Sequence, residues 1–141
     1  MFIGEYSHSI DEKGRVSVPA KFRADLNGGV VVTRGLDTCL FVYPRAEWDV
    51  MAQKLANLPI SQQKNRSFAR LMLAGAWDCD VDSQGRIMLP EYLRRYAGLA
   101  KHVIVAGLYN RFEIWDEDKW HAWATAAEQS SDTLAEEIAL L

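Results

Sequence analysis

Residues 10–19 read IDEKGRVSVP, and residues 81–90 read VDSQGRIMLP. The second stretch repeats an Asp, a Gly, an Arg and a Pro of the first stretch, each 71 residues later. The matched pairs are Asp11 and Asp82, Gly14 and Gly85, Arg15 and Arg86, and Pro19 and Pro90. The apolar residues between these positions also recur. The chain therefore contains an internal duplication centred on these two stretches.

A turn followed by a short strand explains both copies. Asp favours the first position of a tight turn because its carboxylate accepts backbone N–H groups ahead of it, and Gly tolerates positive φ. After the turn, Val16 and Val18 fall on one face of a strand, whereas Arg15 and Ser17 fall on the other. The following Pro ends the strand. Each copy is predicted to hold one arginine at the base of a turn.

The flanking segments repeat in the same order: strand, turn, strand, helix, two strands and a helix. Helices are expected at 20–26 and 91–97, and Trp48 on the helix after Pro44 corresponds to Trp120. Two copies are too few for a solenoid. We therefore expect an α+β fold in which two tandem half-domains share a β-barrel-like core about a pseudo-twofold axis, with flanking helices.

These elements divide the chain into four expected parts. They are a first half with its following helix (1–58), a linker and connecting helix (59–75), a second half (76–123) and an acidic C-terminal helix or tail (124–141).

Composition indicates a soluble globular protein. The chain has 141 residues, of which 49% are hydrophobic and 25% charged. It contains no apolar run long enough to cross a bilayer, and its first residues lack the features of a signal peptide. The cytoplasm is the expected location, without a membrane partner.

The net charge of −3 conceals an uneven distribution. Residues 1–112 carry 15 Lys and Arg against 11 acidic residues, whereas residues 113–141 carry one Lys and eight acidic residues. A mildly basic body therefore precedes an acidic end, and an anionic partner is not excluded. The acidic end has two interpretations: it keeps the protein soluble, or it competes with an anionic ligand for the basic face.

Few residues favour catalysis, a cofactor or a metal. Cys39 and Cys79 form no C-x-x-C motif and are expected to be reduced, and the three histidines lack metal-ligand spacing. The sequence has no Gly-rich phosphate loop, activated-serine turn or H-E-x-x-H motif. We therefore expect neither an enzyme nor a small-molecule substrate, cofactor or metal.

The opening MFIGEYSHSIDEKGRVSVPAKFR (1–23), the duplicated Asp-x-x-Gly-Arg turn and the later FEIWDEDKW (112–120) together resemble the MraZ family of bacterial transcriptional regulators. The resemblance implies an AbrB/SpoVT-like swapped-hairpin fold. It also implies a ring-forming homo-oligomer, associated with the nucleoid, that binds direct repeats in double-stranded DNA upstream of the division and cell-wall gene cluster. The DNA-reading surface of the family maps onto Asp11, Arg15, Asp82 and Arg86. One departure is that Gln84 stands where the first turn has Lys13, so the two turns need not contribute equally.

Two interpretations of each Asp–Arg pair remain open. In the first, the pair is an ion pair that rigidifies the turn. In the second, the aspartate orients an arginine that contacts DNA, and both interpretations can hold together. Exposed ion pairs contribute only about 0 to 1 kcal/mol, so stability gives little reason to duplicate one. Arg15 and Arg86 are the candidates for base or groove contact, and the candidates for phosphate contact are Lys13, Lys21, Arg23, Arg94 and Arg95. For the last four, which lie on expected helices, a solvated helix face is the alternative. The rival hypotheses are a structural ring that binds proteins through its tryptophans and, less favoured, a small enzyme.

Overall fold

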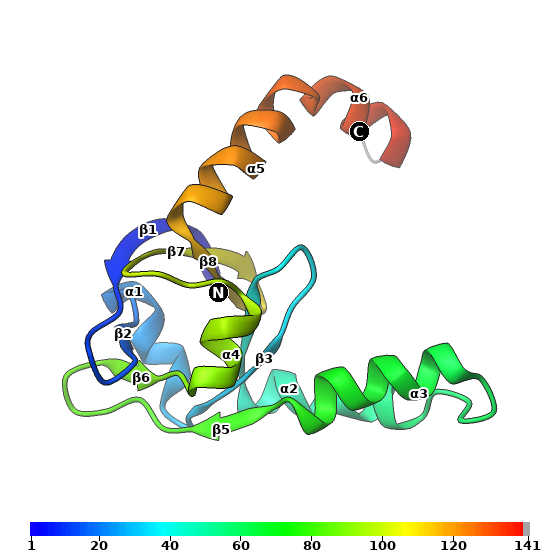
Figure 1. Cartoon of the computed structure of the whole chain (residues 1–141), viewed down its shortest axis with the longest axis horizontal. Coiled ribbons are helices and arrows are strands. Elements are labelled where there is room, and N and C mark those ends of the chain that lie inside the picture. The colour runs from blue at the N-terminus through cyan, green and yellow to red at the C-terminus, as the bar shows by residue number, and fades with distance from the viewer. Residues whose placement is uncertain (140–141) are drawn as a thin grey trace.

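The computed structural model describes residues 1–139 and has an α+β architecture with a mainly antiparallel sheet (Figure 1). Six strands form the large sheet in the order β1-β7-β8-β4-β3-β5, and β2 and β6 form a separate two-stranded sheet. The strands are β1 Phe2–Ser9, β2 Arg15–Ser17, β3 Val30–Arg34, β4 Leu40–Pro44, β5 Trp77–Cys79, β6 Arg86–Met88, β7 His102–Tyr109 and β8 Phe112–Asp116. No helix within the described part of the chain is long and apolar enough to span a membrane.

The helices follow the strands in the order that the duplication predicts. They are α1 Ala20–Arg23 with the 3-10 turn η1 Ala24–Leu26, α2 Arg45–Ala56, α3 Gln63–Ala69 with the π-helical turn η2 Arg70–Ala74, α4 Glu91–Tyr96, α5 Glu117–Gln129 and α6 Ser131–Ile138. Part of the expected acidic tail is therefore helical, and residues 140–141 of that tail lie outside the described residues.

The two halves of the chain exchange strands. β1 comes from the first half but pairs with β7 of the second half, from Phe2 opposite Tyr109 to Ser9 opposite His102. β5 comes from the second half but pairs with β3 of the first half, from Val30 opposite Cys79 to Val32 opposite Trp77. Each half therefore completes the sheet of the other, and neither half has an intact sheet of its own.

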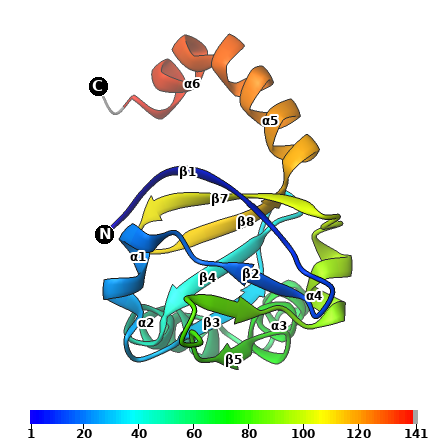
Figure 2. The same ribbon diagram turned by 90° about the vertical axis from the view of Figure 1, so that its left-hand side faces the viewer.

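The main core lies between the large sheet and the β2–β6 ribbon, with α1 and α4 on opposite sides of β2 (Figure 2). Phe22 of α1 lies near its centre, with its ring centroid 5.1 Å from that of Phe2 and 5.4 Å from that of Phe112. Val16 and Ile87 of the ribbon are also buried in this core. The turns are thus fixed to a core built from both halves.

A second core covers the opposite side of the large sheet. Phe41, Tyr43 and Trp115 pack there with residues of α2, η2 and α5. Cys39 is buried in this cluster, Cys79 lies at the edge of the main core, and both are free thiols. Burial raises the pKa of Cys79 to about 11, so the thiol stays protonated at neutral pH.

The structure corrects the expectation of a barrel-like sheet. The large sheet is open, with β1 and β5 as its edges, and it does not close into a barrel within residues 1–139. The reason is that β2 and β6 pair with each other and not with the strands of the large sheet. The bridge between Ile10 and Val16 joins β2 to the segment that follows β1. The ribbon therefore covers the core as a separate layer.

Replacing the central aromatic residue tests whether this shared core holds the two halves together. Phe22→Ala should lower the free energy of unfolding by about 3–5 kcal/mol, because the side chain is fully buried and contacts both halves. Urea unfolding followed by circular dichroism measures the change, with Phe22→Leu as the milder control. A loss below about 1 kcal/mol for the alanine variant would show that the core is not shared in this way.

Candidate nucleic-acid interface

The first turn is closed by its own aspartate. Asp11 Oδ1 accepts the backbone N–H groups of Lys13 and Arg15, each at 2.9 Å, and Asp11 Oδ2 accepts Arg15 Nε at 2.6 Å. Gly14 has a φ of 80°, in the region that favours glycine. One carboxylate therefore fixes both the backbone of the turn and the direction of the arginine.

The second turn repeats these contacts atom for atom. Asp82 Oδ1 accepts the backbone N–H groups of Gln84 and Arg86 at 2.9 Å, and Asp82 Oδ2 accepts Arg86 Nε at 2.9 Å. Gly85 has a φ of 78°. The duplication in sequence is thus a duplication of a hydrogen-bonded unit.

The same hydrogen bonds keep both aspartates ionised. The backbone N–H of Arg15 and then its guanidinium lower the pKa of Asp11, and those of Arg86 lower the pKa of Asp82. Because the pKa of each aspartate is lower in the folded protein than the value of about 3.9 in the unfolded chain, the ionised carboxylates stabilise the fold at pH values above about 3.9. This stabilisation is lost as the pH falls through the lowered pKa. Both Asp–Arg pairs are therefore intact at neutral pH.

The antiparallel ribbon brings the two turns onto one surface. Val16 of β2 lies opposite Ile87 of β6, and both point into the core. Because strand residues alternate, Arg15 and Arg86 lie together on the outer face. Arg86 Nη1 is 4.0 Å from Asp11 Oδ2, so the two Asp–Arg pairs form one cluster. The side chains of Arg15 and Arg86 are 31% and 23% exposed, so each is held by neighbours and still reaches solvent.

Arg23 and Arg94 have a structural position that the sequence did not indicate. Arg23 Nε donates to the carbonyl of Val18 and Arg94 Nε donates to the carbonyl of Leu89, each at 3.0 Å. Each guanidinium also lies on the glycine of the opposite half's turn, Arg23 on Gly85 and Arg94 on Gly14. These two arginines brace the turns across the halves, and their contact with phosphate stays a prediction.

The remaining candidates are exposed. Lys13 lies in the first turn, Lys21 on α1 and Arg95 on α4, and all three side chains face solvent. The outer face of the ribbon also contains Met88, opposite Arg15, which the sequence analysis did not single out. The duplication could have identified Met88, because it lies 71 residues after Ser17, which the strand pattern places on the same face as Arg15.

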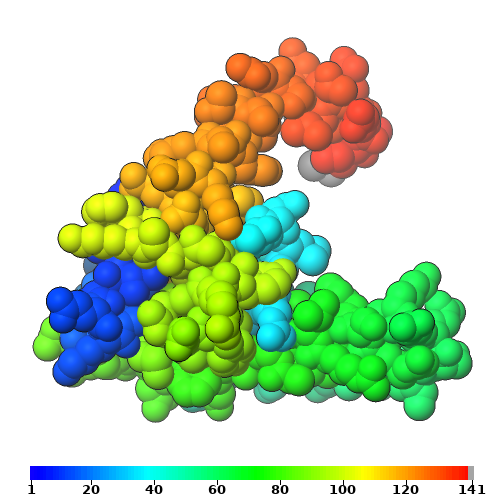
Figure 3. Space-filling view, viewed as in Figure 1, coloured from blue at the N-terminus to red at the C-terminus, as the bar shows by residue number. Residues whose placement is uncertain are grey.

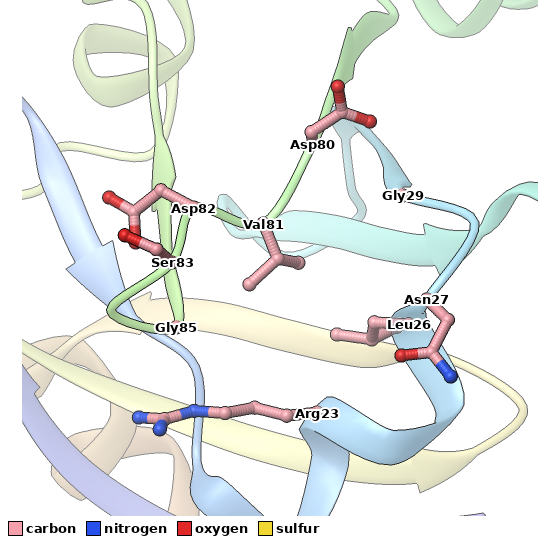
Figure 4. Close-up of a pocket in the computed structure, with 9 residues that line it drawn as sticks. All are labelled: Arg23, Leu26, Asn27, Gly29, Asp80, Val81, Asp82, Ser83 and Gly85. Carbon is pink, nitrogen blue, oxygen red and sulfur yellow. The ribbon is translucent and has the colours of Figure 1, made fainter.

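A hollow of about 370 Å³ lies beside the second turn (Figure 4). Arg23 crosses one side of it, Asp82 and Ser83 lie on the other, and Val81 points toward Leu26. Asp80 adds a second carboxylate to its lining. The carboxylates of Asp80 and Asp82 outnumber the single guanidinium of Arg23, which is already hydrogen-bonded to the carbonyl of Val18. This balance of charge disfavours binding of an anion in the hollow. The ribbon face is therefore the better candidate for contact with DNA.

The surroundings of the two turns differ in charge. Asp78 and Asp80 precede the second turn, where the first half has Ser7 and Ser9. Arg45 Nη2 partly offsets these carboxylates, at 2.6 Å from Asp78 Oδ1 and 3.3 Å from Asp80 Oδ1. The surroundings of the second turn are therefore the more acidic, whereas Glu12 offsets the charge of Lys13 within the first turn.

The fold and the site define a two-repeat α+β protein whose repeats jointly present a pair of oriented arginines. The family model described as "MraZ protein, putative antitoxin-like" matches residues 1–71 and again residues 72–141. The chain belongs to the MraZ family of transcriptional regulators, which is not a family of enzymes.

Several curated relatives are similar over nearly their whole length. The transcriptional regulator MraZ of Natranaerobius thermophilus is 51% identical over 138 residues, which cover 98% of this chain and 96% of the relative. The same regulator from Ligilactobacillus salivarius is 49% identical over 138 residues, covering 98% and 96%. That of Acetivibrio thermocellus is 45% identical over 141 residues, covering 100% and 99%. These matches agree with the resemblance seen in the duplicated turn.

The turn glycines provide a direct test of the turn geometry. Gly14→Ala should lower the free energy of unfolding by about 1–3 kcal/mol, because φ is positive there and an added Cβ would lie 2.8 Å from the carbonyl oxygen of Leu89. Gly28→Ala is the matched control, since an added Cβ there meets nothing within 4 Å. Denaturant unfolding measures both variants, and equal stabilities would contradict the described turn.

Proposed function

We propose that this chain is a sequence-specific DNA-binding regulator that acts on the promoter of the division and cell-wall gene cluster. It binds direct repeats there as a ring oligomer, through the paired Asp-x-x-Gly-Arg turns, in the cytoplasm at the nucleoid. The observation that carries the proposal is the joint position of Arg15 and Arg86 on one outward ribbon face. The AbrB/SpoVT-like swapped-hairpin relationship of the halves and the four-part division of the chain remain predictions within this proposal.

The chemistry of the ribbon suits the major groove of DNA. A two-stranded β-ribbon fits that groove, where a guanidinium pairs with O6 and N7 of guanine or with a phosphate. Nε of each arginine is used by its aspartate, which leaves the Nη1 and Nη2 groups as donors. The aspartates repel phosphate but accept a hydrogen bond from N4 of cytosine. The cluster therefore favours base edges over backbone, and the exposed lysines favour phosphate.

Oligomerisation is part of the proposed mechanism. A few phosphate contacts per chain give weak binding at cellular salt. Joining several chains makes the later contacts intramolecular and raises the effective concentration, provided that the DNA sites are spaced to match. Evenly spaced direct repeats suit such an assembly.

A ring that binds proteins without contacting DNA is the second candidate. Trp115, Trp120 and Trp123 form an aromatic cluster in which Trp123 is 46% exposed, and exposed tryptophans often anchor protein partners. This candidate requires no role for the arginines, and the following experiment separates the two.

The decisive measurement is a titration of labelled promoter DNA containing the repeats at several salt concentrations. Arg15→Ala and Arg86→Ala should each weaken binding by about 5–150-fold, the equivalent of about 1–3 kcal/mol for a lost bidentate contact. Arg15→Lys should also bind weakly, because an ammonium cannot reproduce the planar donors. Lys54→Ala, an exposed change on α2, is the control. Unchanged binding by both arginine variants, with circular dichroism showing them folded, would favour the protein-binding ring.

The unequal turns give a second expectation. Gln84→Lys gives the second turn the charge that Lys13 supplies to the first, so binding should tighten and become more salt-dependent. The slope of log K against log salt should steepen by about 0.9 for each added phosphate contact. Lys13→Gln should have the opposite effect, and Gln84→Ala is the neutral control. A slope that is identical in all three variants would remove these positions from the phosphate-binding surface.

A further inference from the structure

The last two helices extend away from the body of the protein (Figure 1). We call residues 117–138, which form α5 and α6, the C-terminal arm. Every residue of α6 is exposed, including the apolar Leu134 and Ile138, which are 44% and 70% exposed. Isolated helices shorter than about 12–15 residues are marginal in water. An eight-residue helix with its apolar side exposed therefore lacks the packing that normally stabilises one.

The duplication shows which contact the arm lacks. In the first repeat, Met51 of α2 is partly buried in the second core, together with residues of α3 and η2. Its counterpart in the second repeat, 72 residues later, is Trp123 of α5, which is 46% exposed. α2 is thus packed against a following helical segment, whereas the corresponding face of α5 is left open to solvent. A helix in that place would cover Trp123.

The outer face of α3 and η2 has the matching chemistry. Lys64 of α3 and Arg70 and Leu71 of η2 are exposed on this segment. Leu71 follows Lys64 by seven residues, about two helical turns, and Arg70 directly precedes Leu71. Residues 57–75 contain three basic residues and no acidic residue, whereas residues 117–138 contain six acidic residues and one lysine. The two surfaces are therefore complementary in charge, and each has exposed apolar side chains among its charges.

Figures 1 and 3 show the arm and the α2–α3 hairpin leaving the body at separate places, with open space between them. The loop between β3 and β4, with the exposed Leu36, borders the same space. The arm is therefore accessible from this side to another molecule.

We propose that the α3–η2 face of one copy docks on the C-terminal arm of the next copy. Leu71 packs against Trp123 and Leu134, and Lys64 and Arg70 face the acidic residues of the arm. The contact is heterologous, because each copy uses one surface for one neighbour and a different surface for the other neighbour. Heterologous contacts generate a closed ring when the rotation that relates successive copies adds up to a full turn. The inference rests on the proposed oligomer and goes beyond it by assigning the two surfaces that meet.

Charge reversal tests the assignment in the full-length chain without DNA. The variant Lys64→Glu/Arg70→Glu should reduce the assembly to smaller species in native mass spectrometry, and so should Glu136→Lys/Glu137→Lys. A chain that combines both pairs of changes should recover assembly. Lys64→Arg/Arg70→Lys preserves the charge and is the matched control, and circular dichroism shows that each variant is folded. Unaltered assembly of both reversed variants, or a monomeric unaltered chain, would overturn the proposal.

Cysteine pairing tests the direction of the contact. Leu71→Cys and Leu134→Cys are made in separate chains, both with Cys79→Ser, because the remaining Cys39 is fully buried. Mild oxidation of the mixed chains should give a disulfide-linked pair that neither chain forms alone. No crosslink in the mixture, or a crosslink in the Leu71→Cys chain alone, would overturn the heterologous contact.

The outcome is independent of the DNA proposal. Arg15→Ala should assemble like the unaltered chain, because the ribbon lies outside both proposed surfaces. If the charge-reversed variants assemble normally while DNA binding still depends on the arginines, only this inference is overturned. If the mixed cysteine chains crosslink as expected but the arginine variants bind DNA like the unaltered chain, only the proposed function is overturned.

Discussion

The antiparallel pairing of β2 with β6 is the contact on which the rest of the structure depends. It places Val16 and Ile87 side by side in the main core and so turns the arginines of both halves outward. Around it, the backbone N–H of Val18 donates to the carbonyl of Gly85, and that of Leu89 donates to the carbonyl of Gly14, each at 2.8 Å. Each half therefore holds the turn of the other, and breaking one turn disturbs both.

This exchange explains why charged side chains can be fixed at an exposed site. Exposed ion pairs are usually weak, because ordering two side chains costs entropy. In each turn the aspartate is already ordered by two backbone N–H groups before the arginine binds to it. The guanidinium thus loses little further freedom when it meets a ligand, and a preorganised donor binds more strongly than a mobile one.

The two repeats share a plan and have diverged in surface chemistry. The first repeat has a lysine in its turn and a basic α3, whereas the second has aspartates beside its turn and an acidic arm. Such unequal ends suit the proposed head-to-tail contact, because a heterologous interface joins two different surfaces. The two turns keep the same Asp–Arg hydrogen bonds, whereas the ends of the chain differ in charge.

The sequence by itself determined the local units. Each Asp-x-x-Gly-Arg turn is closed by hydrogen bonds within five residues, so its geometry and its arginine follow from the residues present. Tertiary structure alone decided which strands exchange, that the sheet stays open, and that Arg23 and Arg94 cross to the opposite turns. The physical reason is that these contacts join residues about 45 to 107 positions apart, and local propensity and periodicity do not specify a partner at that distance.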